Sequence, residues 1–414
     1  MEYGLIGRHL KHSFSKEVHE RLEPYNYLLK ELEPEEIQSF MTRKNFKAIN
    51  VTIPYKEEVI KYLDYKSIEV EKTNSCNTIV RVGSKLYGYN TDILGLKDAI
   101  ISSNYNVKDK TVLVLGTGGA SKSCVYVLNE LGAKEVVLVS RSKKENTITY
   151  GELDKYYDSA SLIINATPVG MYPNNYDKPI ELSPFKNLEG VIDLVYNPLK
   201  TKLIEEAESL NIKSINGLYM LVSQALYSID YFLDTKTDKE KVSEIARDIY
   251  KSKRNIVLIG MPTSGKTTIG QILSRRLKRV HIDTDDFVKK IIRMPIKKYF
   301  KLYGEEKFRD KEELVISEIA KLNSKVISTG GGAILREANI KKLKMNSIII
   351  FIDRAKDNLY LSSTRPLLNS REDIDRLYNE RIELYRKYAD IIIENNSDFK
   401  ETLERIIEVL KWKY

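Results

Sequence analysis

The chain has 414 residues, of which 42% are hydrophobic and 30% are charged. This composition is typical of globular proteins and excludes disordered or collagen-like chains. No apolar run approaches the roughly 18 residues of a membrane span, and the N-terminus lacks the basic-then-apolar order of a signal peptide. The two cysteines cannot build a disulfide framework and match no zinc motif. We therefore expect a cytoplasmic protein of two or three domains, at roughly 150 residues per domain, with no membrane partner.

The net charge of +9 is unevenly distributed along the chain. Residues 1–253 carry 34 basic and 35 acidic side chains, whereas residues 254–414 carry 33 and 23. A basic half attracts either nucleic acid or a polyphosphate together with an anionic substrate. Because its basic residues alternate with acidic ones, we expect small anionic ligands and no nucleic acid.

Short apolar runs alternate with helical patterns along most of the chain, which is typical of parallel α/β units. The clearest strands are expected at Tyr3–Ile6, Ala48–Val51, Thr111–Leu115, Val136–Val139, Leu162–Asn165, Val191–Leu194, Ile256–Ile259, Val280–Ile282, Val326–Ser328, Ile348–Ile352 and Ile391–Ile393. In the polar stretch Thr235–Arg254, apolar residues recur at helical spacing. This stretch is predicted to be the last helix of the first half, with a linker near Lys251–Arg254.

A glycine-rich turn follows the expected strand Thr111–Leu115, and a helical segment follows the turn to Leu131. Glycines let the backbone approach a ligand, and a helix N-terminus presents N–H groups to a pyrophosphate. The match to G-x-G-x-x-G/A is imperfect, so a simple tight turn remains an alternative. The residues expected to contact a dinucleotide are Gly116, Gly118, Gly119, Ala120 and Ser121.

The next expected strand ends at Ser140–Lys144, about where an NAD site places an acidic residue for the ribose hydroxyls. A basic residue at this place, Arg141, instead suits a 2′-phosphate. We therefore expect NADP, with an exposed basic loop as the alternative.

Four polar clusters in the first hundred residues are not explained by periodicity. They are Ser13-Phe-Ser15, Asn50-Val-Thr52-Ile-Pro54-Tyr-Lys56, Asn77-Thr78 and Asn90-Thr91-Asp92. In this order they resemble the motifs of shikimate dehydrogenases. The resemblance continues with Asn165–Met171, Asp193–Pro198 and Gly217–Gln224 and covers essentially all of residues 1–250.

This resemblance implies reduction of 3-dehydroshikimate to shikimate by hydride from NADPH. Hydride addition to a ketone leaves an alkoxide, to which Lys56 can supply a proton and a positive charge while Asp92 positions the ammonium. The substrate carboxylate would be bound by Ser13 and Ser15, with help from Tyr196. The ring hydroxyls would be bound by Thr52, Asn77 and Gln224. The cofactor would be contacted by Thr167 and Gly217. Each polar residue alone is also typical of a turn or a cap, so the prediction rests on their joint occurrence.

The second half opens with an intact G-x-x-x-x-G-K-[ST] motif directly after the expected strand Ile256–Ile259. Backbone N–H groups of such a loop cradle the phosphates of ATP, while Lys266 reaches the β- and γ-phosphates and Thr267 binds Mg²⁺. The expected nucleotide contacts are Gly260, Met261, Pro262, Thr263, Ser264, Gly265, Lys266, Thr267 and Thr268.

The motifs that follow resemble shikimate kinases over residues 255–414. They are Asp283-Thr-Asp285, Gly304–Arg309, Gly330-Gly331-Gly332, Arg365–Leu368 and Arg381-x-x-x-Tyr385. By this resemblance Asp283 helps to hold the metal, and Asp285 binds the reacting hydroxyl and takes its proton. Arg309 and Arg381 would bind the substrate carboxylate, Gly331 and Gly332 would lie against the ring, and Arg365 would reach the transferring phosphate from a mobile lid. The lid, placed between Arg365 and Arg381, is a few residues shorter than usual. Taken singly, the aspartates also suit helix caps, the glycines a turn and the arginines the surface.

Together these readings predict a bifunctional enzyme that uses NADP(H), ATP and Mg²⁺. Its α/β architecture comprises a substrate-binding domain over residues 1–100 completed by helices within 217–250, a Rossmann-like domain over 101–216, and a P-loop kinase domain with a five-stranded parallel sheet over 251–414. Two alternatives remain: a quinate-type dehydrogenase joined to another small-molecule kinase, and a ligand-sensing regulator without turnover. The oligomeric state, including a homo-oligomer, is left open.

Overall fold

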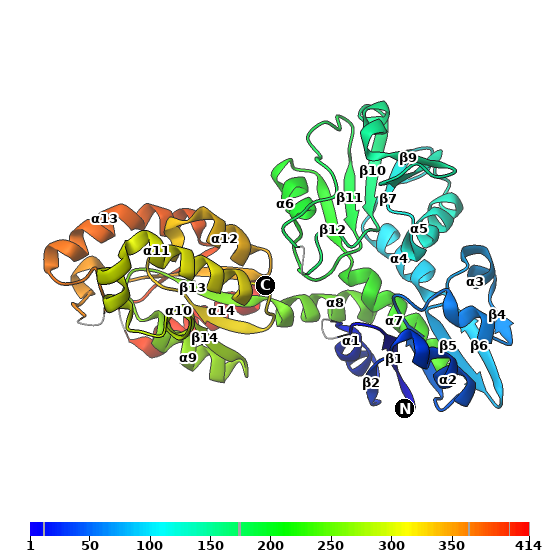
Figure 1. The fold of residues 1–414 in the computed structure, drawn as a ribbon, viewed down its shortest axis with the longest axis horizontal. Helices are drawn as coiled ribbons and strands as arrows, with labels where there is room; N and C mark the ends of the chain where they lie inside the picture. The colour runs from blue at the N-terminus through cyan, green and yellow to red at the C-terminus, as the bar shows by residue number, and fades with distance from the viewer. Residues whose placement is uncertain (11–12, 173–174, 363–364, 397, 414) are drawn as a thin grey trace. The chain divides into compact units, whose positions relative to one another are not determined.

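The chain folds into two compact units, Met1–Tyr250 and Lys251–Tyr414 (Figure 1). The computed structural model describes residues 1–10, 13–172, 175–362, 365–396 and 398–413. These residues form two six-stranded sheets in the first unit and one five-stranded sheet in the second. None of the described helices is long and apolar enough to cross a membrane.

The first sheet has the strand order β2-β1-β3-β5-β6-β4. Its elements are β1 (Tyr3–Gly7), α1 (Ser15–Leu22), β2 (Tyr27–Glu31), α2 (Pro34–Arg43), β3 (Ala48–Val51), the 3₁₀ helix η1 (Glu58–Tyr62), β4 (Tyr65–Lys66), α3 (Ile68–Thr73), β5 (Thr78–Val82) and β6 (Lys85–Tyr89). The expected parallel pairing is present between β1 and β2, between β1 and β3 and between β4 and β6. It fails at β5, which runs antiparallel to both β3 and β6. Only two residues, Gly83 and Ser84, join β5 to β6, and so short a connection makes a hairpin.

The second sheet is parallel throughout, with the order β12-β11-β10-β7-β8-β9. Its elements are α4 (Thr91–Ser102), β7 (Thr111–Leu115), α5 (Gly119–Glu130), β8 (Glu135–Ser140), β9 (Thr147–Thr149), η2 (Tyr150–Tyr156), β10 (Ala160–Asn165), β11 (Gly190–Asp193), α6 (Lys202–Ser209) and β12 (Lys213–Asn216). Alternate residues of β7 face opposite layers. Leu113 and Leu115 pack in the core with α6, whereas Val112 and Val114 pack in the core with α4 and α5.

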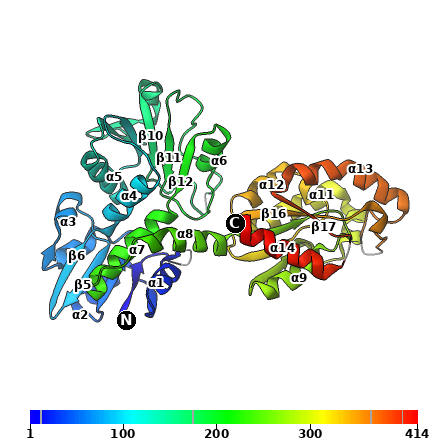
Figure 2. The ribbon, with the colours of Figure 1, turned by 180° about the vertical axis from the view of Figure 1, so that it is seen from behind.

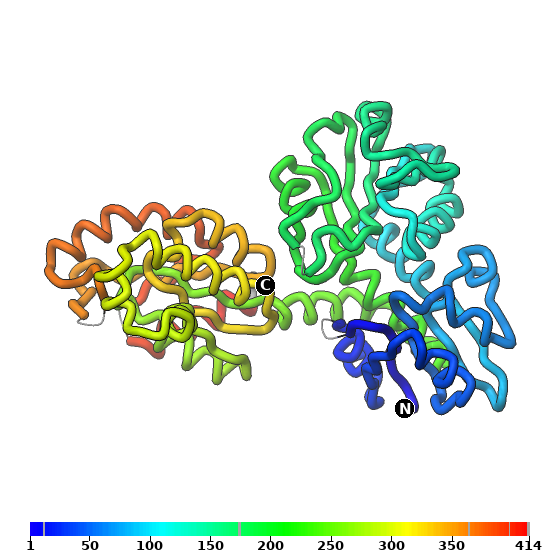
Figure 3. Tube along the Cα trace, viewed as in Figure 1, coloured from blue at the N-terminus to red at the C-terminus, as the bar shows by residue number. Residues whose placement is uncertain are grey.

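Helix α7 (Leu218–Leu233) brings the chain back to the first sheet, where it lies beside α4 and α1 (Figure 2). The tube in Figure 3 follows this path out along α4 and back along α7. Val222 and Leu226 of α7 share a core with Phe14 and Val18. The first unit is therefore closed by a helix that lies more than a hundred residues away in sequence from the sheet it covers.

Helix α8 (Glu240–Lys253) includes the segment expected to be a linker. Its apolar residues Val242, Ala246 and Ile249 are buried in the same core as α7, as the helical spacing predicted. The helix continues through most of the expected linker to Lys253, and the two units divide between Tyr250 and Lys251, at the start of that segment. The carbonyl groups at its end are not left unpaired: Arg279 donates to the carbonyl of Lys251 at 3.0 Å.

The sheet of the second unit is parallel, with the order β14-β15-β13-β16-β17. Its elements are β13 (Asn255–Ile259), α9 (Lys266–Arg276), β14 (Val280–Asp283), α10 (Thr284–Ile292), α11 (Ile296–Ile319), β15 (Lys325–Ser328), η3 (Ala333–Leu335), α12 (Glu337–Lys344), β16 (Ser347–Asp353), η4 (Lys356–Asn358), α13 (Arg371–Tyr388), β17 (Ile391–Glu394) and α14 (Phe399–Lys413). Val257 and Ile259 of the central strand pack with α10 to α13, and Ile256 and Leu258 pack with α9 and α14. A sheet covered on both faces leaves the carboxyl ends of its strands as the place for a site.

One buried histidine of the first unit gives a pH prediction. His19 is fully buried, its Nδ1 lies 2.6 Å from the hydroxyl of Tyr25, and its ring stacks on Tyr27 at 4.0 Å between centroids. Burial lowers the pKa of His19 from 6.5 to about 3. Below pH 6.5 the unfolded chain therefore binds a proton that the folded chain does not, so the stability contribution of neutral His19 is lost as the pH falls.

We expect the free energy of unfolding of the first unit to decrease toward acid with a His19 contribution approaching about 1.4 kcal/mol per pH unit. His19→Gln should remove this contribution, whereas His9→Gln, at an exposed position, should keep it. Urea unfolding between pH 7 and pH 5 measures the three slopes. Equal slopes for the wild type and His19→Gln would contradict the assignment.

Two candidate active sites

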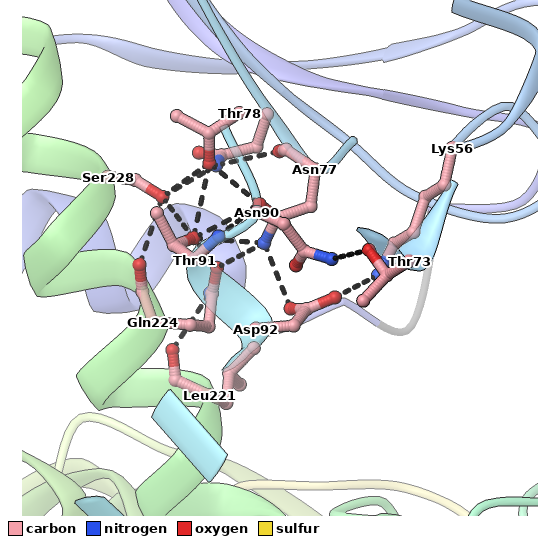
Figure 4. A network of polar contacts seen from close by, with 11 residues as sticks. Lys56, Thr73, Asn77, Thr78, Asn90, Thr91, Asp92, Leu221, Gln224 and Ser228 are labelled. Carbon is pink, nitrogen blue, oxygen red and sulfur yellow. Dashed lines mark hydrogen bonds and ion pairs between the residues drawn. The ribbon is translucent and has the colours of Figure 1, made fainter. Parts of the chain in front are cut away.

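The first site centres on an ion pair between the loop after β3 and the first turn of α4. Lys56 Nζ lies 2.5 Å from Asp92 Oδ2, and Asn77 Nδ2 donates to Asp92 Oδ1 at 2.9 Å (Figure 4). The side chains of Lys56 and Asp92 remain 22% and 13% exposed, so both border solvent. Because each oxygen of Asp92 is bound by a donor, the carboxylate holds the ammonium in one place.

Of two further residues expected to contact the substrate, Gln224 is hydrogen-bonded into the network of the Lys56–Asp92 pair, and Thr52 lies on the same loop as Lys56. Gln224 of α7 belongs to the same network, since its Oε1 lies 3.3 Å from Asn77 Nδ2, and its Nε2 donates to the carbonyl of Leu221 at 2.9 Å. Thr52 is half-buried at the start of the loop that carries Lys56. The structure therefore connects Lys56, Asn77, Asp92 and Gln224 directly and places Thr52 on the same loop.

A second group of hydroxyls gathers at the N-terminus of α1. Ser13 Oγ lies 3.1 Å from Ser15 Oγ and also accepts from the Ser15 N–H at 3.2 Å. The ring of Tyr196 packs on Phe14 at 5.2 Å between centroids. Burial raises the pKa of the Tyr196 phenol, and a hydrogen bond with Ser13 opposes that shift. Ser13, Ser15 and Tyr196 thus form a group of hydroxyls suited to a carboxylate.

The glycine-rich turn lies between β7 and the N-terminus of α5. No acidic residue occupies the first turn of α5, and among the described residues nothing hydrogen-bonds the buried Oγ of Ser121. Open N–H groups and an unpartnered hydroxyl fit a pyrophosphate. Thr167 lies against Gly116, and Gly217 precedes α7 as its N-cap.

The basic loop after β8 adds a residue that the sequence did not single out. Arg141 is exposed directly after the strand, whereas Lys144 Nζ donates to Thr117 Oγ1 in the glycine-rich turn at 3.0 Å. The sequence feature that could have indicated Lys144 is its position in the same basic loop, three residues after Arg141. Both cations fit the phosphates of an NADP molecule.

The phosphate-binding loop of the second unit joins β13 to α9. Lys266 is 6% exposed, and its Nζ donates to the carbonyls of Gly260 and Met261 at 2.9 and 2.7 Å. Burial lowers the pKa of Lys266 to about 7, and the cation of Arg365 adds to this shift. The loop therefore holds its lysine by its own carbonyl groups, with a positive side chain next to it.

Thr267 and Asp283 form a pair of oxygen ligands beside this loop, with Thr267 Oγ1 2.7 Å from Asp283 Oδ2. The described residues contain no group of three or more His, Cys, Asp or Glu placed to hold a metal. Mg²⁺ is usually held by one or two protein ligands together with phosphate and water oxygens. The pair fits that pattern.

A cavity of about 940 Å³ lies next to the phosphate-binding loop. The predicted kinase residues that line it are Pro262, Asp285, Arg309, Gly331, Gly332, Arg365 and Arg381. Arg309 and Arg381 are 6% and 3% exposed, and Arg381 Nε has no hydrogen-bond partner among the described residues. Arg309 is paired with Glu305 and Glu312, and Arg381 Nε lies 3.5 Å from Glu380. Of the two buried guanidinium groups on this cavity, Arg381 is therefore the more open to an anion.

Close packing explains a glycine at one position of this cavity. A Cβ on Gly332 would lie 2.0 Å from Arg309 Nη2. Any side chain there would overlap the guanidinium and force Arg309 out of its position.

Glu312 also lines the cavity, although it belongs to none of the predicted site residues. Its Oε2 accepts from Arg309 Nη1 at 2.8 Å, while its Oε1 has no hydrogen-bond partner among the described residues. Burial raises the pKa of Glu312, and Arg309 opposes that shift. In sequence, a glutamate three residues after an arginine is typical of a pair on a helix surface, and only the fold shows that it is buried.

The segment that carries Arg365 differs from the predicted lid. Arg365 forms an ion pair with Asp285 across the cavity. The segment predicted to be a lid, from Arg365 to Arg381, is largely helical, because α13 begins at Arg371 behind a capping box in which Ser370 and Asp373 bind each other's backbone. Such a box stabilises a helix start.

The two units thus define two classes of catalytic protein on one chain. A Rossmann-type glycine turn next to a Lys–Asp pair is typical of a dinucleotide-dependent oxidoreductase. A phosphate-binding loop beside an anion cavity is typical of a small-molecule kinase.

Comparison with known proteins identifies the family of each unit. The shikimate dehydrogenase substrate binding domain matches residues 5–79, and shikimate kinase matches residues 262–411. A shikimate dehydrogenase (NADP(+)) of Clostridium perfringens is 35% identical over 266 residues, which cover 60% of this chain and 97% of that protein. The chain belongs to the shikimate dehydrogenase family, and its second unit is a shikimate kinase domain.

Solved structures give the same result for the first unit. Shikimate dehydrogenase 1 of Peptoclostridium difficile matches with a TM-score of 0.56 and 35% identity over 60% of this chain and 98% of its own. A shikimate 5-dehydrogenase of Thermus thermophilus in complex with NADP(H) and shikimate matches with a TM-score of 0.55 and 27% identity over 60% and 99% of the two chains. The chain is a bifunctional protein of the shikimate pathway.

Proposed function

We propose that the first unit reduces 3-dehydroshikimate to shikimate with NADPH and that the second phosphorylates shikimate with MgATP. The observation that carries the proposal is the presence of two complete sets of groups on one chain. Lys56, Asp92 and Asn77 lie in one hydrogen-bonded set, and Asp285, Arg309 and Arg381 line one cavity next to a phosphate-binding loop. The product of the first reaction is the substrate of the second.

In the reduction, bound NADPH supplies the hydride. Lys56 Nζ donates the proton that the forming alkoxide needs, and Asp92 keeps the ammonium beside the reacting carbon. Asn77 and Gln224 bind ring hydroxyls, while Ser13, Ser15 and Tyr196 bind the carboxylate. The similar protein of Thermus thermophilus, which forms a complex with NADP(H) and shikimate, supports these ligands.

In the phosphorylation, bound MgATP supplies the phosphoryl group. Asp285 accepts the proton of the attacking hydroxyl, and Arg309 and Arg381 bind the carboxylate through planar, paired hydrogen bonds. Lys266 stabilises charge on the transferring group. Arg365 is paired with one carboxylate oxygen of Asp285 in the structure, and it would have to leave that oxygen to reach the phosphate.

The test is an assay of the purified chain with 3-dehydroshikimate, NADPH and MgATP. We expect NADPH loss and, after it, ADP formation in equal amounts. ADP formation should stop when 3-dehydroshikimate is omitted and return when shikimate is added. Oxidation of quinate in preference to shikimate would instead support the quinate-type alternative, and an absence of turnover on all these substrates would support the regulator.

The cofactor preference can be tested at the loop after β8. Arg141→Asp should move the ratio of kcat/KM from NADPH toward NADH, because the 2′-phosphate would lose a counter-charge and meet a like charge. Lys134→Asp makes the same charge change at an exposed position directly before β8, whereas Arg141 directly follows that strand. This control variant should leave the ratio unchanged. An unchanged ratio in Arg141→Asp would leave Lys144 as the candidate for this contact.

A further inference from the structure

Behind the Lys56–Asp92 pair lies a group of buried hydroxyls for which the proposed reaction has no role. We call Thr78, Thr91 and Ser228 the hydroxyl cluster. They come from β5, α4 and α7, and each has 0% of its surface exposed. Their oxygens lie 3.0 to 3.1 Å apart (Figure 4). Fully buried polar groups cost free energy unless they are paired, so their bonding can be followed proton by proton.

Ser228 can only accept hydrogen bonds from its neighbours in the cluster. A hydroxyl has one proton, and Ser228 Oγ donates its proton to the carbonyl of Gln224 at 2.9 Å. Thr91 Oγ1 and Thr78 Oγ1 both lie 3.0 Å from Ser228 Oγ, and Thr78 Oγ1 has another acceptor in Asn77 Oδ1 at 3.0 Å. With Thr78 bonded to Asn77, Thr91 is the donor to Ser228. Thr91 then presents a lone pair on its other side.

That lone pair faces Asn77. Asn77 Nδ2 has two protons: one reaches Asp92 Oδ1 and the other reaches Thr91 Oγ1, both at 2.9 Å, while a third acceptor, Gln224 Oε1, lies farther away at 3.3 Å. The orientation of this amide is unambiguous, because the backbone N–H of Thr91 donates to Asn77 Oδ1 at 2.7 Å. The bonds therefore run in one direction, from Asn77 through Thr91 and Ser228 to the carbonyl of Gln224.

The side-chain amide of Asn50 also binds the hydroxyl cluster. Tyr27 donates to Asn50 Oδ1 at 2.8 Å, so Asn50 Nδ2 is turned toward Ser228 Oγ at 2.8 Å and toward the carbonyl of Asn77 at 3.1 Å. The approach of α7 to α4 that brings Ser228 to Thr91 depends on Gly95, where a Cβ would lie 2.8 Å from the carbonyl of Met220.

We propose that Ser228 is a positioning residue of the reductase, which acts through Thr91 to hold the amide of Asn77 against Asp92. This inference rests on the proposed function of the first unit. Without the Ser228 acceptor, the Thr91 proton turns to Asn77 Oδ1 at 3.2 Å or to Gln224 Oε1 at 3.4 Å. A Thr91 hydroxyl that donates to Asn77 Oδ1 turns its proton toward the amide from which it otherwise accepts. This weakens one of the two bonds that hold the amide beside the catalytic pair.

The alternative is that Ser228 only helps α7 to pack. Ser223 provides a matched control on the same helix: it is equally buried, and its hydroxyl donates to Asp98 Oδ2 at 2.8 Å, outside the network. Both serines change to alanine with the loss of one hydroxyl. A packing effect would be shared by the two variants, whereas a positioning effect would belong to Ser228 alone.

The experiment compares Ser228→Ala, Ser223→Ala and Asn77→Ala, and combines each serine change with Asn77→Ala. We expect Ser228→Ala to lower kcat for 3-dehydroshikimate reduction about tenfold, the scale of one hydrogen bond, with KM changed less than kcat. Ser223→Ala should lower kcat less than about twofold at a similar shift in Tm. In the Asn77→Ala background Ser228→Ala should cause almost no further loss, because its route to Asp92 is already removed.

Each outcome decides between the two readings. A tenfold loss that vanishes in the Asn77→Ala background supports the inference. An equal loss in both backgrounds, or equal effects of Ser228→Ala and Ser223→Ala, overturns it. A wild-type chain that does not reduce 3-dehydroshikimate would contradict the proposed function itself. Because the substitutions all lie in the first unit, the thermal unfolding transition of that unit, measured on the same samples, shows whether each variant is folded.

Discussion

Lys56→Ala is expected to lower reduction of 3-dehydroshikimate by about 10²–10⁴-fold, the usual scale for a positioned proton donor. The change removes the only group that contacts Asp92 Oδ2 within the described network, and with it both the proton and the positive charge for the alkoxide. Substrate binding should be retained in part, because Ser13, Ser15 and Asn77 remain. Steady-state kinetics of NADPH oxidation give the two parameters.

The matched control for Lys56→Ala is Lys61→Ala in the following 3₁₀ helix, where the side chain is 63% exposed and pairs only loosely with Glu58 at 3.8 Å. This variant should reduce the ketone at the wild-type rate. Near-normal turnover in Lys56→Ala would remove Lys56 from the chemistry and leave it as a structural partner of Asp92.

Lys266→Ala is expected to lower phosphorylation of shikimate by about 10²–10³-fold or more, since a preorganised charge on the transferring group is lost. Reduction of 3-dehydroshikimate should be unchanged, because all groups of that site lie in the other unit. Both activities are measured on one preparation, so the reductase serves as the internal control. Lys341→Ala, at a 55% exposed position on α12, should affect neither.

The buried position of Lys266 calls for a second variant. Its stem fills space beneath the loop, and its Nζ satisfies two carbonyl groups, so alanine removes packing as well as charge. Lys266→Met keeps most of the volume and should lose phosphorylation to the same extent. A severe loss of reductase activity in either folded variant would replace the picture of two independent sites with a coupled one.

The parts of the fold that the sequence predicted are those whose local pattern and tertiary environment agree. Central strands such as β7 and β13 are buried on both faces and therefore appear as continuous apolar runs. The edge strand β2 was not recognised, because four of its five residues are exposed. The hairpin of β5 and β6 was missed for a related reason: β5 ends in two exposed residues and β6 begins with one, so neither strand appears as a continuous buried apolar run.

The candidate sites likewise contain residues that the sequence predicted and residues that it did not. Motif residues such as Lys56, Asp92 and Lys266 could be named because their chemistry is tied to a short spacing in sequence. Glu312 and Ser228 could not, since a glutamate on a helix and a serine on an apolar helix acquire a role only from residues that distant segments bring near. Only the three-dimensional structure shows that Glu312 Oε1 lacks a partner among the described residues and that the Ser228 proton is bound by the carbonyl of Gln224.

Helix α8 has a consequence for how the two enzymes are joined. Proteases cut extended backbone, and boundaries between folded units are usually their preferred sites because such boundaries are exposed loops. Here the boundary between Tyr250 and Lys251 lies inside a helix that ends only at Lys253. Ser252 and Lys253 at its end are bound in turn by Ser324. The junction must therefore unwind before it can enter a protease cleft, which protects a two-enzyme chain at the place where fusions are ordinarily cleaved.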